Sequence, residues 1–402
     1  MCVHRILSKY MTSAYSFDEI VNREGTDSVK YDARTEFFGT AEVIPMWVAD
    51  MDFRTPPFVA DALKKRMEHE IYAYSIRSGE YYEAVTGWLK RRHQWEVPAE
   101  AVLFSPGVVP AVNMAVLAYT QPGDRIIVQP PVYFPFFGAV KDHGRELVYN
   151  PLKLEQGRLC MDFENLEQVA SAGARMLILS SPHNPGGSVW TEEELRRLAE
   201  ICLRNDILIL SDEIHCDLVF KPHKHIPLAC LSSEIADRCI TAFAASKTFN
   251  LSGLSTASVI ITREDLRNRF RETLDHLHIG GGNIAGTVAS RAALTYGDEW
   301  VDDLMMYLSG NLDILESFLL KHIPQITMVR PEATFLVWLD CRKMNMDDET
   351  LNRFFIEKAG LGLNRGDMFG PGGSGFMRMN IGCPKSTLNL ALEKLKQAMD
   401  KG

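Results

Sequence analysis

The sequence predicts an α/β fold in which a mostly parallel sheet of seven strands is covered by helices on both faces. Short apolar runs bounded by turn residues alternate with helical stretches through the middle of the chain, a pattern typical of parallel sheets. One helix, expected over residues 191–204, opens with Thr191 and Glu194 at the spacing of a capping box. The seven strands are expected at 102–104, 126–129, 147–149, 176–180, 207–211, 240–244 and 257–261.

The last hundred residues have a different texture and predict a smaller α+β unit. A long helix is expected over 298–322, followed by an extended run at 334–339 and a helix over 347–358. A strand around 377–381 and a closing helix from about Thr387 complete it. No long Pro/Ser linker separates the two units, so they are expected to pack closely.

The composition excludes several classes of function. The 43 basic and 52 acidic side chains give a net charge of −9, and no basic stripe of the kind that binds nucleic acid is present. The longest apolar runs, at 176–179 and 207–210, are far too short to span a bilayer. The eight cysteines form no CxxC pair and no zinc-ligand spacing, which favours a reducing cytoplasm and no bound metal.

Four polar segments follow strands of the predicted sheet, where ligands bind in open α/β sheets. Taken singly, each has an ordinary explanation: a glycine at a helix start is a tight turn, an aspartate after a strand is an N-cap, and a lone lysine is a solvated surface residue. Taken together, they supply different groups that one cofactor needs. The segments are 105–109 (SPGVV), 181–187 (SPHNPGG), 212–215 (DEIH) and 245–250 (ASKTFN).

The first two requirements are a phosphate site and a partner for a ring nitrogen. Backbone N–H groups at a helix N-terminus bind phosphate, and Gly107, Val108 and Val109 stand at such a point. A pyridine ring that accepts electrons needs a carboxylate to keep its nitrogen protonated, and Asp212 is the candidate.

The remaining requirements concern the oxygen and the aldehyde of the same ring. Asn184 and His215 are candidate partners for a phenolate oxygen. Lys247, between a strand end and a glycine-containing loop, is a candidate amine for a Schiff base with the aldehyde. The set as a whole indicates pyridoxal 5′-phosphate (PLP).

These motifs, in this order, carry a resemblance to a known family. SPGVV, SPHNPGG, SDEIH and SKTFNLSG, with FMRMNIGCP near the end, resemble the fold-type I PLP enzymes of the aminotransferase class I/II superfamily from about Phe17 to the C-terminus. Residues 45–53 (PMWVADMDF) are similar to the motif of the MalY/PatB-like C-S lyases.

The resemblance implies a fold-type I, aminotransferase-like architecture. It divides the chain into an N-terminal tail (1–16), a segment that contributes to the small domain (17–60), a large PLP-binding domain (61–297) and a small C-terminal domain (298–402).

The resemblance also implies roles for residues outside the four segments. Tyr133 would stack on the pyridine ring, and Ser246 would bind the phosphate. Tyr74 resembles the tyrosine that reaches the phosphate of the neighbouring subunit's cofactor, which implies a homodimer with shared active sites. An ordinary half-buried aromatic is the alternative for Tyr74.

The implied substrate contacts are Arg378, Asn184, Trp47 and Ala49. Arg378 would pair with the substrate α-carboxylate through its planar fork. A surface arginine on a strand is the alternative for Arg378. Trp47 and Ala49 lie in the loop expected to contact the distal part of the substrate.

Two positions depart from the common aminotransferase pattern. Many aminotransferases carry tyrosine where this chain has His215, and histidine there is a feature of the C-S lyases. Many carry a phosphate-binding arginine eight residues after the Schiff-base lysine, where this chain has Ser255. One phosphate contact is therefore expected from Ser246, from Tyr74 of a second subunit or from the helix N-terminus.

The function that follows is a PLP-dependent C-S β-lyase. Lys247 would take the Cα proton, a thiolate would leave Cβ, and cystathionine or a related cysteine S-conjugate would give a thiol such as homocysteine, pyruvate and ammonia. The alternative is a class I/II aminotransferase. A third reading is a regulatory interaction protein that retains PLP.

Overall fold

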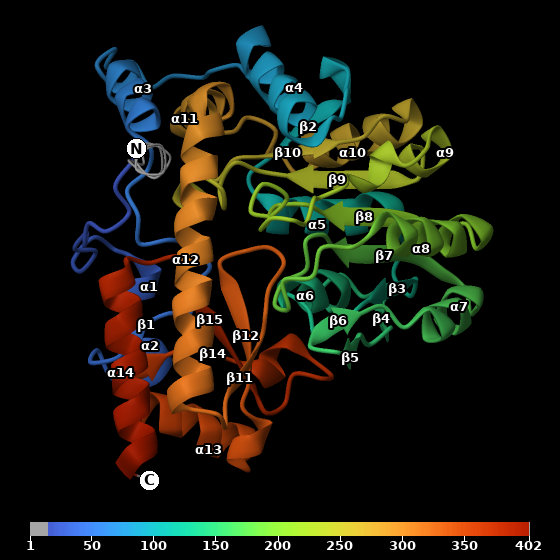
Figure 1. Ribbon diagram of the computed structural model, residues 1–402. Coiled ribbons are helices and arrows are strands. Elements are labelled where there is room, and N and C mark those ends of the chain that lie inside the picture. The colour runs from blue at the N-terminus through green and yellow to red at the C-terminus, as the bar shows by residue number, and fades with distance from the viewer. Residues whose placement is uncertain (1–14, 402) are drawn as a thin grey trace, which may run out of the picture.

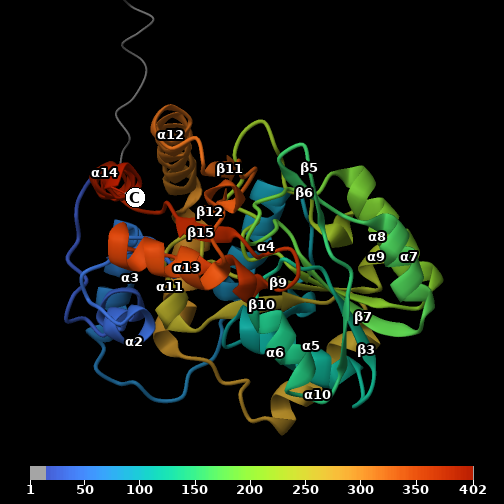
Figure 2. The ribbon, with the colours of Figure 1, turned by 90° about the horizontal axis from the view of Figure 1, so that it is seen from below.

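The computed structural model describes residues 15–401, so most of the tail expected at 1–16 lies outside the described residues. Two sheets organise the chain, one central and one near the C-terminal end (Figures 1 and 2). Among the described helices, none is both long and apolar enough to cross a bilayer.

The central sheet has seven strands in the order β2-β10-β9-β8-β7-β3-β4. All neighbours are parallel except β10, which runs antiparallel to β2 and β9. The predicted fold class and all seven predicted strands are confirmed. The strands are β2 (Val102–Ser105), β3 (Arg125–Val128), β4 (Glu146–Tyr149), β7 (Ala174–Ser180), β8 (Leu208–Asp212), β9 (Cys239–Phe243) and β10 (Ala257–Ile260).

Helices cover both faces of this sheet because its central strands are apolar on both sides. Met176 and Ile178 of β7 pack into one core cluster, whereas Leu177 and Leu179, which alternate with them, pack into the other. Helices α5 (Val108–Tyr119), α6 (Pro135–Lys141) and α10 (Glu264–His276) cover the first face, and α7 (Phe163–Ser171) and α8 (Glu192–Arg204) the second (Figure 1).

The predicted capping box at the start of α8 is confirmed. The Thr191 side chain accepts a hydrogen bond from the Glu194 N–H, and the Glu194 side chain accepts one from the Thr191 N–H. The remaining elements of this part of the chain are α1 (Val29–Asp32), α2 (Arg34–Phe38), α3 (Pro57–Met67), α4 (Gly79–His93), β5 (Lys153–Glu155), β6 (Arg158–Cys160), α9 (Ser233–Ala236) and α11 (Ile284–Tyr296).

The C-terminal part begins with helix α12 (Asp298–His322), as predicted. It builds an antiparallel sheet in the order β11-β12-β15-β14. The helix expected over 347–358 is α-helical only over α13 (Asp348–Arg353) and continues as a π-helix over Phe354–Lys358. The other elements are β11 (Thr327–Val329), β12 (Leu336–Asp340), β13 (Leu361–Gly362), β14 (Asn364–Arg365), β15 (Phe376–Asn380) and α14 (Lys385–Lys401).

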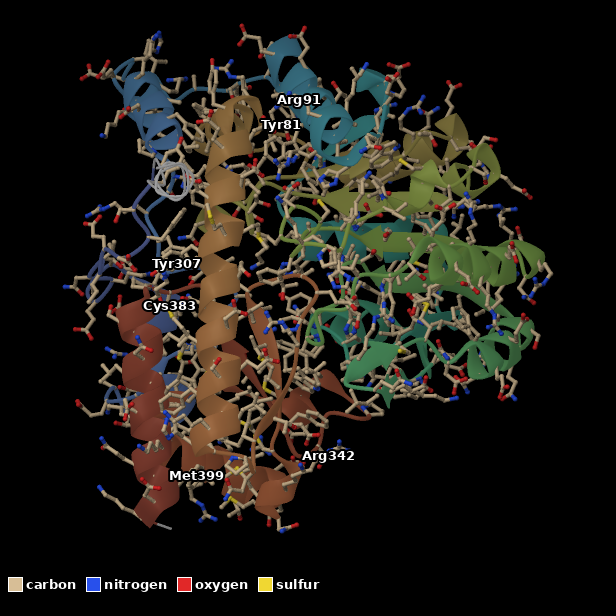
Figure 3. All side chains as sticks on the ribbon, in the orientation of Figure 1. Tyr81, Arg91, Tyr307, Arg342, Cys383 and Met399 are labelled. Atoms are coloured by element: carbon tan, nitrogen blue, oxygen red, sulfur yellow. The ribbon has the colours of Figure 1, made fainter. Side chains whose placement is uncertain are left out.

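The N-terminal segment packs against this C-terminal part. Strand β1 (Ile44–Pro45) pairs with β13. The hydroxyl of Tyr307 on α12 donates to Asp18 and accepts from the backbone N–H of Lys385 at the start of α14 (Figure 3). The boundaries proposed at 60/61 and 297/298 stay predictions.

Hydrogen bonds of Glu332 connect the C-terminal part to loops of the central sheet. Its backbone N–H donates to the Gly187 carbonyl at 3.0 Å, and its carboxylate accepts from the Val189 N–H at 2.7 Å and from Arg158 Nε at 3.1 Å. Gly187 is required here, because φ is +74° and a Cβ would lie 2.3 Å from the Cβ of Pro331.

Candidate active site

A cavity of about 220 Å³ lies at the carboxyl edge of the central sheet. The start of the antiparallel strand β10 reaches the same edge, because Ala257 pairs with Ser105 at the end of β2. The structure brings together most of the predicted site residues here. The cavity is lined by Ala49, Pro106, Gly107, Val108, Val109, Pro110, Tyr133, Ser180, Asn184, Asp212, Ile214, His215, Ser246, Lys247, Ser252, Ser255 and Thr256.

Lys247 follows strand β9 and carries the amine of the cavity. Its Nζ donates a hydrogen bond to the carbonyl oxygen of Ala49 at 2.6 Å. Burial lowers the pKa of Lys247 from 10.5 to about 8; Arg378 adds to this shift, and the Asp50 and Asp212 carboxylates oppose it. Roughly a tenth of the amine is therefore unprotonated at pH 7, far more than for a lysine with an ordinary pKa, and the unprotonated form is the one a nucleophile requires.

Asp212 ends strand β8 and is buried, with 5% of its surface exposed. Burial raises the pKa of its carboxyl from 3.8 to about 7, although the Ile214 N–H at 3.1 Å and the charge of Lys247 oppose the shift. A buried carboxylate of this kind is stabilised by a cation placed against it. A protonated ring nitrogen would be such a cation.

His215 is buried, and its Nδ1 has no hydrogen-bond partner among residues 15–401. Burial, with the charges of Lys247 and Arg378, lowers the pKa of the imidazole to about 3, so the ring is neutral. Its other contacts include the Phe335 ring, at 6.2 Å between centroids. A buried polar atom without a partner marks a place where a ligand atom is expected.

Arg378 lies on β15 and is only 3% exposed, so it is not a surface arginine. Its Nη1 donates to Asn184 Oδ1 at 3.0 Å, and its Nη2 donates to the Trp47 carbonyl at 3.0 Å and to Asn364 Oδ1 at 2.6 Å. Its Nε has no partner among the described residues. Burial lowers the pKa of Arg378 to about 10, and it remains a cation with a free donor.

Hydroxyl groups and a helix N-terminus also line the cavity. Gly107, with φ of +140°, precedes the first turn of α5 and turns the chain into that helix. Ser246, Ser252, Ser255 and Thr256 line the same cavity. Sequence reasoning missed Ser252 and Thr256, because a serine or threonine in a loop carries no local signal.

The backbone carbonyls of residues 47–50 each accept a hydrogen bond from a side chain of the site. The Trp47 and Ala49 carbonyls accept from Arg378 and Lys247. The carbonyls of Val48 and Asp50 accept from the Asn380 side chain, each at 2.6 Å. This short stretch therefore contacts both cations of the site through its backbone.

Trp47 reaches the site differently from what the resemblance implied. Its indole N–H donates to the Lys30 carbonyl at 3.1 Å, and its ring lies 4.4 Å from that of Phe37. The indole does not line the cavity. The Trp47 carbonyl accepts a hydrogen bond from Arg378, the residue predicted to bind the α-carboxylate of the substrate.

Tyr74 lies on the surface, fully exposed and outside the cavity of its own chain. It belongs to a stretch between α3 and α4 whose apolar side chains face solvent, Ile71, Tyr72 and Ile76 among them. Arg77, which follows, donates to the carbonyls of Gly280 and Gly281. The role of Tyr74 at the cofactor of a neighbouring subunit stays a prediction.

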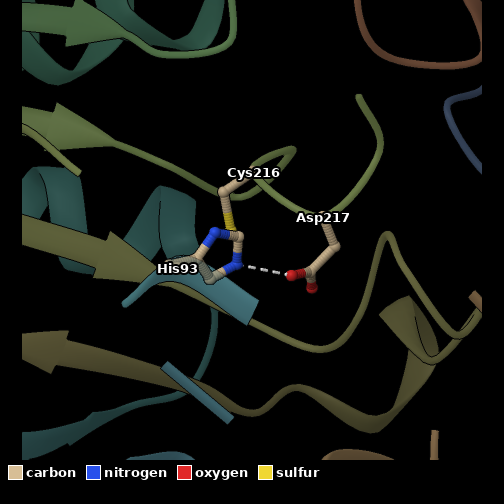
Figure 4. A group of neighbouring side chains, drawn as sticks. All are labelled: His93, Cys216 and Asp217. Carbon is tan, nitrogen blue, oxygen red and sulfur yellow. Dashed lines mark hydrogen bonds and ion pairs between the residues drawn. The ribbon is translucent and has the colours of Figure 1, made fainter. Parts of the chain in front are cut away.

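Among the described residues, one group has potential metal-ligand atoms within 4.8 Å of one another: His93, Cys216 and Asp217 (Figure 4). The Asp217 carboxylate already shares a hydrogen bond with His93 Nε2 at 2.7 Å and accepts from Trp88 Nε1 and Thr248 Oγ1, both at 2.9 Å. Because these partners occupy both carboxylate oxygens of Asp217, we interpret its hydrogen bonds to His93, Trp88 and Thr248 as a structural network next to Lys247. We call this network the Asp217 brace.

Comparison with known proteins identifies the family. The sequence profile described as "Aminotransferase class I and II" matches residues 41–395. The chain belongs to the aminotransferase class I and II family.

Within this family the chain is similar to several carbon–sulfur lyases. It is 42% identical to cystathionine beta-lyase PatB of Bacillus subtilis (strain 168), covering 96% of this chain and 100% of PatB. It is 31% identical to protein MalY of Escherichia coli (strain K12), covering 96% and 99%. The resemblance stated from the motifs is confirmed.

Solved structures give the same result. Cystalysin from Treponema denticola, which contains a pyridoxal 5′-phosphate cofactor, has a TM-score of 0.94 and 34% identity over 96% of this chain and 99% of that one. The PLP-bound C-S lyase from Staphylococcus hominis has a TM-score of 0.89 and 34% identity over 96% and 98%. The fold-type I architecture is therefore confirmed.

Proposed function

We propose that this chain is a PLP-dependent carbon–sulfur β-lyase that cleaves cystathionine or a related cysteine S-conjugate to a thiol, pyruvate and ammonia. The observation that carries the proposal is the hydrogen bond between Lys247 and the Ala49 carbonyl. It joins the predicted cofactor-binding lysine to the PMWVADMDF segment shared with the C-S lyases. The named relatives, PatB and the Staphylococcus hominis enzyme among them, support the same activity.

The cavity fits PLP on three independent observations. Asp212 is a buried carboxylate without a cation in contact, which suits the ring nitrogen. The unpartnered Nδ1 of His215 suits the phenolate oxygen, with the Asn184 side chain as a second candidate. Tyr133 lines the cavity and would cover a face of the ring.

The phosphate would be held without an arginine at position 255. The N-terminal turn of α5, at Gly107, Val108 and Val109, offers backbone donors. Four hydroxyl groups line the same cavity as that turn. Their neutral hydrogen-bond donors would take the place of the charged guanidinium that many aminotransferases have. They belong to Ser246, Ser252, Ser255 and Thr256.

Lys247 would supply the acid–base chemistry. When bound, PLP provides an electron-withdrawing ring that stabilises negative charge at the substrate Cα. The Lys247 amine, once free, accepts the Cα proton, because its pKa of about 8 lets it be unprotonated near neutrality. The C–S bond then breaks, and the thiolate leaves with the bonding electron pair.

Arg378 would hold the substrate by its α-carboxylate. It is buried, keeps a free Nε donor and is held in place by Asn184 and Asn364. Its free Nε–H would donate a charge-assisted hydrogen bond to a carboxylate oxygen, which would help to fix the Cα–H bond relative to Lys247.

We further propose a cytoplasmic homodimer with shared active sites. The exposed apolar stretch at Ile71, Tyr72, Tyr74 and Ile76 is the kind of surface that a second subunit covers. All seven cysteines within residues 15–401 are free thiols, in keeping with a reducing compartment.

The decisive experiment is to incubate the PLP-loaded protein with cystathionine and to measure pyruvate and free thiol, with and without an added keto acid. The lyase releases both products without a keto acid. Lys247→Ala is expected to lose nearly all turnover, whereas Lys358→Ala, at an exposed position, keeps it. Turnover that requires a keto acid would instead establish an aminotransferase.

A further inference from the structure

Four charged side chains of the N-terminal segment form a partly buried cluster, to which residues 47–51 contribute Asp50. Arg23 donates to both carboxylate oxygens of Asp50, at 2.9 and 2.8 Å, and to Asp52 at 2.7 Å. Lys30, only 1% exposed, donates to Asp52 at 2.9 Å and to the Asp50 carbonyl at 3.3 Å. Two cations thus face two carboxylates, and the cluster is formally neutral.

The cluster adjoins Lys247 through Asp50. Ala49, whose carbonyl accepts the Lys247 hydrogen bond, is the residue directly before Asp50. Although Asp50 is mostly buried, its pKa is lowered, because the hydrogen bond from Arg23 and the charge of Lys30 outweigh the effect of burial. Asp50 is therefore a permanent negative charge close to the amine.

Asp50 is paired with Arg23 and forms no direct ion pair with Lys247. Both Asp50 oxygens are taken by the guanidinium, and Lys247 makes no salt bridge with any residue of 15–401. The other groups around the amine are the Asp212 carboxyl, the Arg378 cation and the neutral His215 ring. Because Asp212 itself is protonated in part near neutrality, Asp50 is the dependable negative charge of this set.

We propose that Asp50 is a positioning residue for the Lys247 amine: fixed by Arg23 and Lys30, its carboxylate balances the ammonium charge without a direct contact while the neighbouring Ala49 carbonyl holds the amine. A direct ion pair would withdraw the amine from the cavity, whereas no carboxylate at all would leave the buried ammonium beside Arg378 uncompensated. The proposal rests on the proposed function in one respect, that Lys247 is the residue that reacts with the cofactor.

The test measures the titration of Lys247 in the full chain freed of cofactor. The amine is labelled competitively with acetic anhydride between pH 6 and 10, and the Lys247 peptide is quantified by mass spectrometry. Wild type is expected to titrate near pH 8. Asp50→Asn is expected to titrate about one pH unit lower, because an opposite charge that favoured the ammonium is gone. Asp61→Asn, a surface substitution, leaves the midpoint unchanged.

The direction of the shift separates this role from simple structural damage. A loosened site admits water and moves the midpoint up, towards 10.5, so an unchanged or raised midpoint in a folded Asp50→Asn protein overturns the proposal. If that variant does not fold, Asp50→Ser decides: it also removes the carboxylate and must lower the midpoint, and an unchanged or raised midpoint overturns the proposal. The labelling needs neither substrate nor turnover. If the lyase assay fails while Asp50→Asn still lowers the Lys247 midpoint, only the proposed function is wrong.

Discussion

Asn364 and Arg378 face each other across neighbouring antiparallel strands, and Asn364 Oδ1 accepts a hydrogen bond from Arg378 Nη2 at 2.6 Å. Both side chains are buried, so the carboxamide holds one arm of the guanidinium where water does not compete. This pairing holds in place a guanidinium whose Nε has no hydrogen-bond partner among the described residues.

Asn364→Ala is therefore expected to raise KM for cystathionine more than it lowers kcat. A buried hydrogen bond to a charged group contributes about 1.5–3 kcal/mol, which corresponds to roughly a 10–100-fold loss in kcat/KM. Steady-state kinetics measure the effect, and Asn389→Ala on the exposed face of α14 is the control. An unchanged KM in a folded variant would show that Asn364 does not position Arg378.

Asp212→Asn is expected to weaken cofactor binding and yet to stabilise the protein without cofactor at alkaline pH. The carboxyl has a pKa of about 7 when folded and 3.8 when unfolded, so the folded state holds the proton more tightly and stability falls as pH rises from about 4 to 7. The variant lacks this loss, and at pH 8 its gain is on the order of 2–4 kcal/mol, by the conversion of pKa shifts to free energy. Urea unfolding at pH 5 and pH 8 measures it; equal effects at both pH values would contradict the assignment.

Tyr74 can be tested by mixing two inactive chains. If Tyr74 serves the neighbouring subunit, a mixed dimer of Tyr74→Ala and Lys247→Ala contains one intact site, and equal random mixing restores about a quarter of wild-type activity. Each variant is first assayed alone, and the mixture is unfolded and refolded together. Absence of any recovery, with mixed dimers verified by mass spectrometry, would place the tyrosine outside the site.

The Asp217 brace is expected to contribute to stability and to need no metal. Asp217→Ala leaves the donors of His93, Trp88 and Thr248 buried without their acceptor, at a cost of about 3–5 kcal/mol in the free energy of unfolding. Asp302→Ala, which breaks an exposed ion pair with Arg92, costs about 1 kcal/mol or less. A chelator is expected to leave the wild-type unfolding curve unchanged, and a shift on chelation would instead indicate a bound ion.

The sequence predicts the sheet and the main site residues because both leave local patterns. An apolar run between turns is visible as a strand, and Asp212 and Lys247 stand directly after such runs. The direction of β10 is not predictable in this way, because a strand that is buried on both faces has the same apolar character in either direction. Yet that direction is what brings Thr256 and Ser255 into the cavity.

Other parts of the site depend on contacts between distant segments. Asn364 is one polar residue in a two-residue strand, and its importance follows only from its register with Arg378. Arg23 and Lys30 precede Asp52 by 29 and 22 residues and reach it only after the chain has folded back. Trp47 was expected to contact substrate, but its indole N–H donates to the Lys30 carbonyl and its ring packs against Phe37.

The alternating carbonyls of residues 47–51 have a consequence for mutagenesis. The contacts to Arg378 and Lys247 come from the main chain at Trp47 and Ala49, which every substituted amino acid also possesses. A scan that changes only side chains will therefore score these two positions as unimportant to the cations they hold. Replacing the relevant peptide linkages by esters, which weakens the carbonyl as an acceptor, would reveal a dependence that no exchange among the twenty residues can expose.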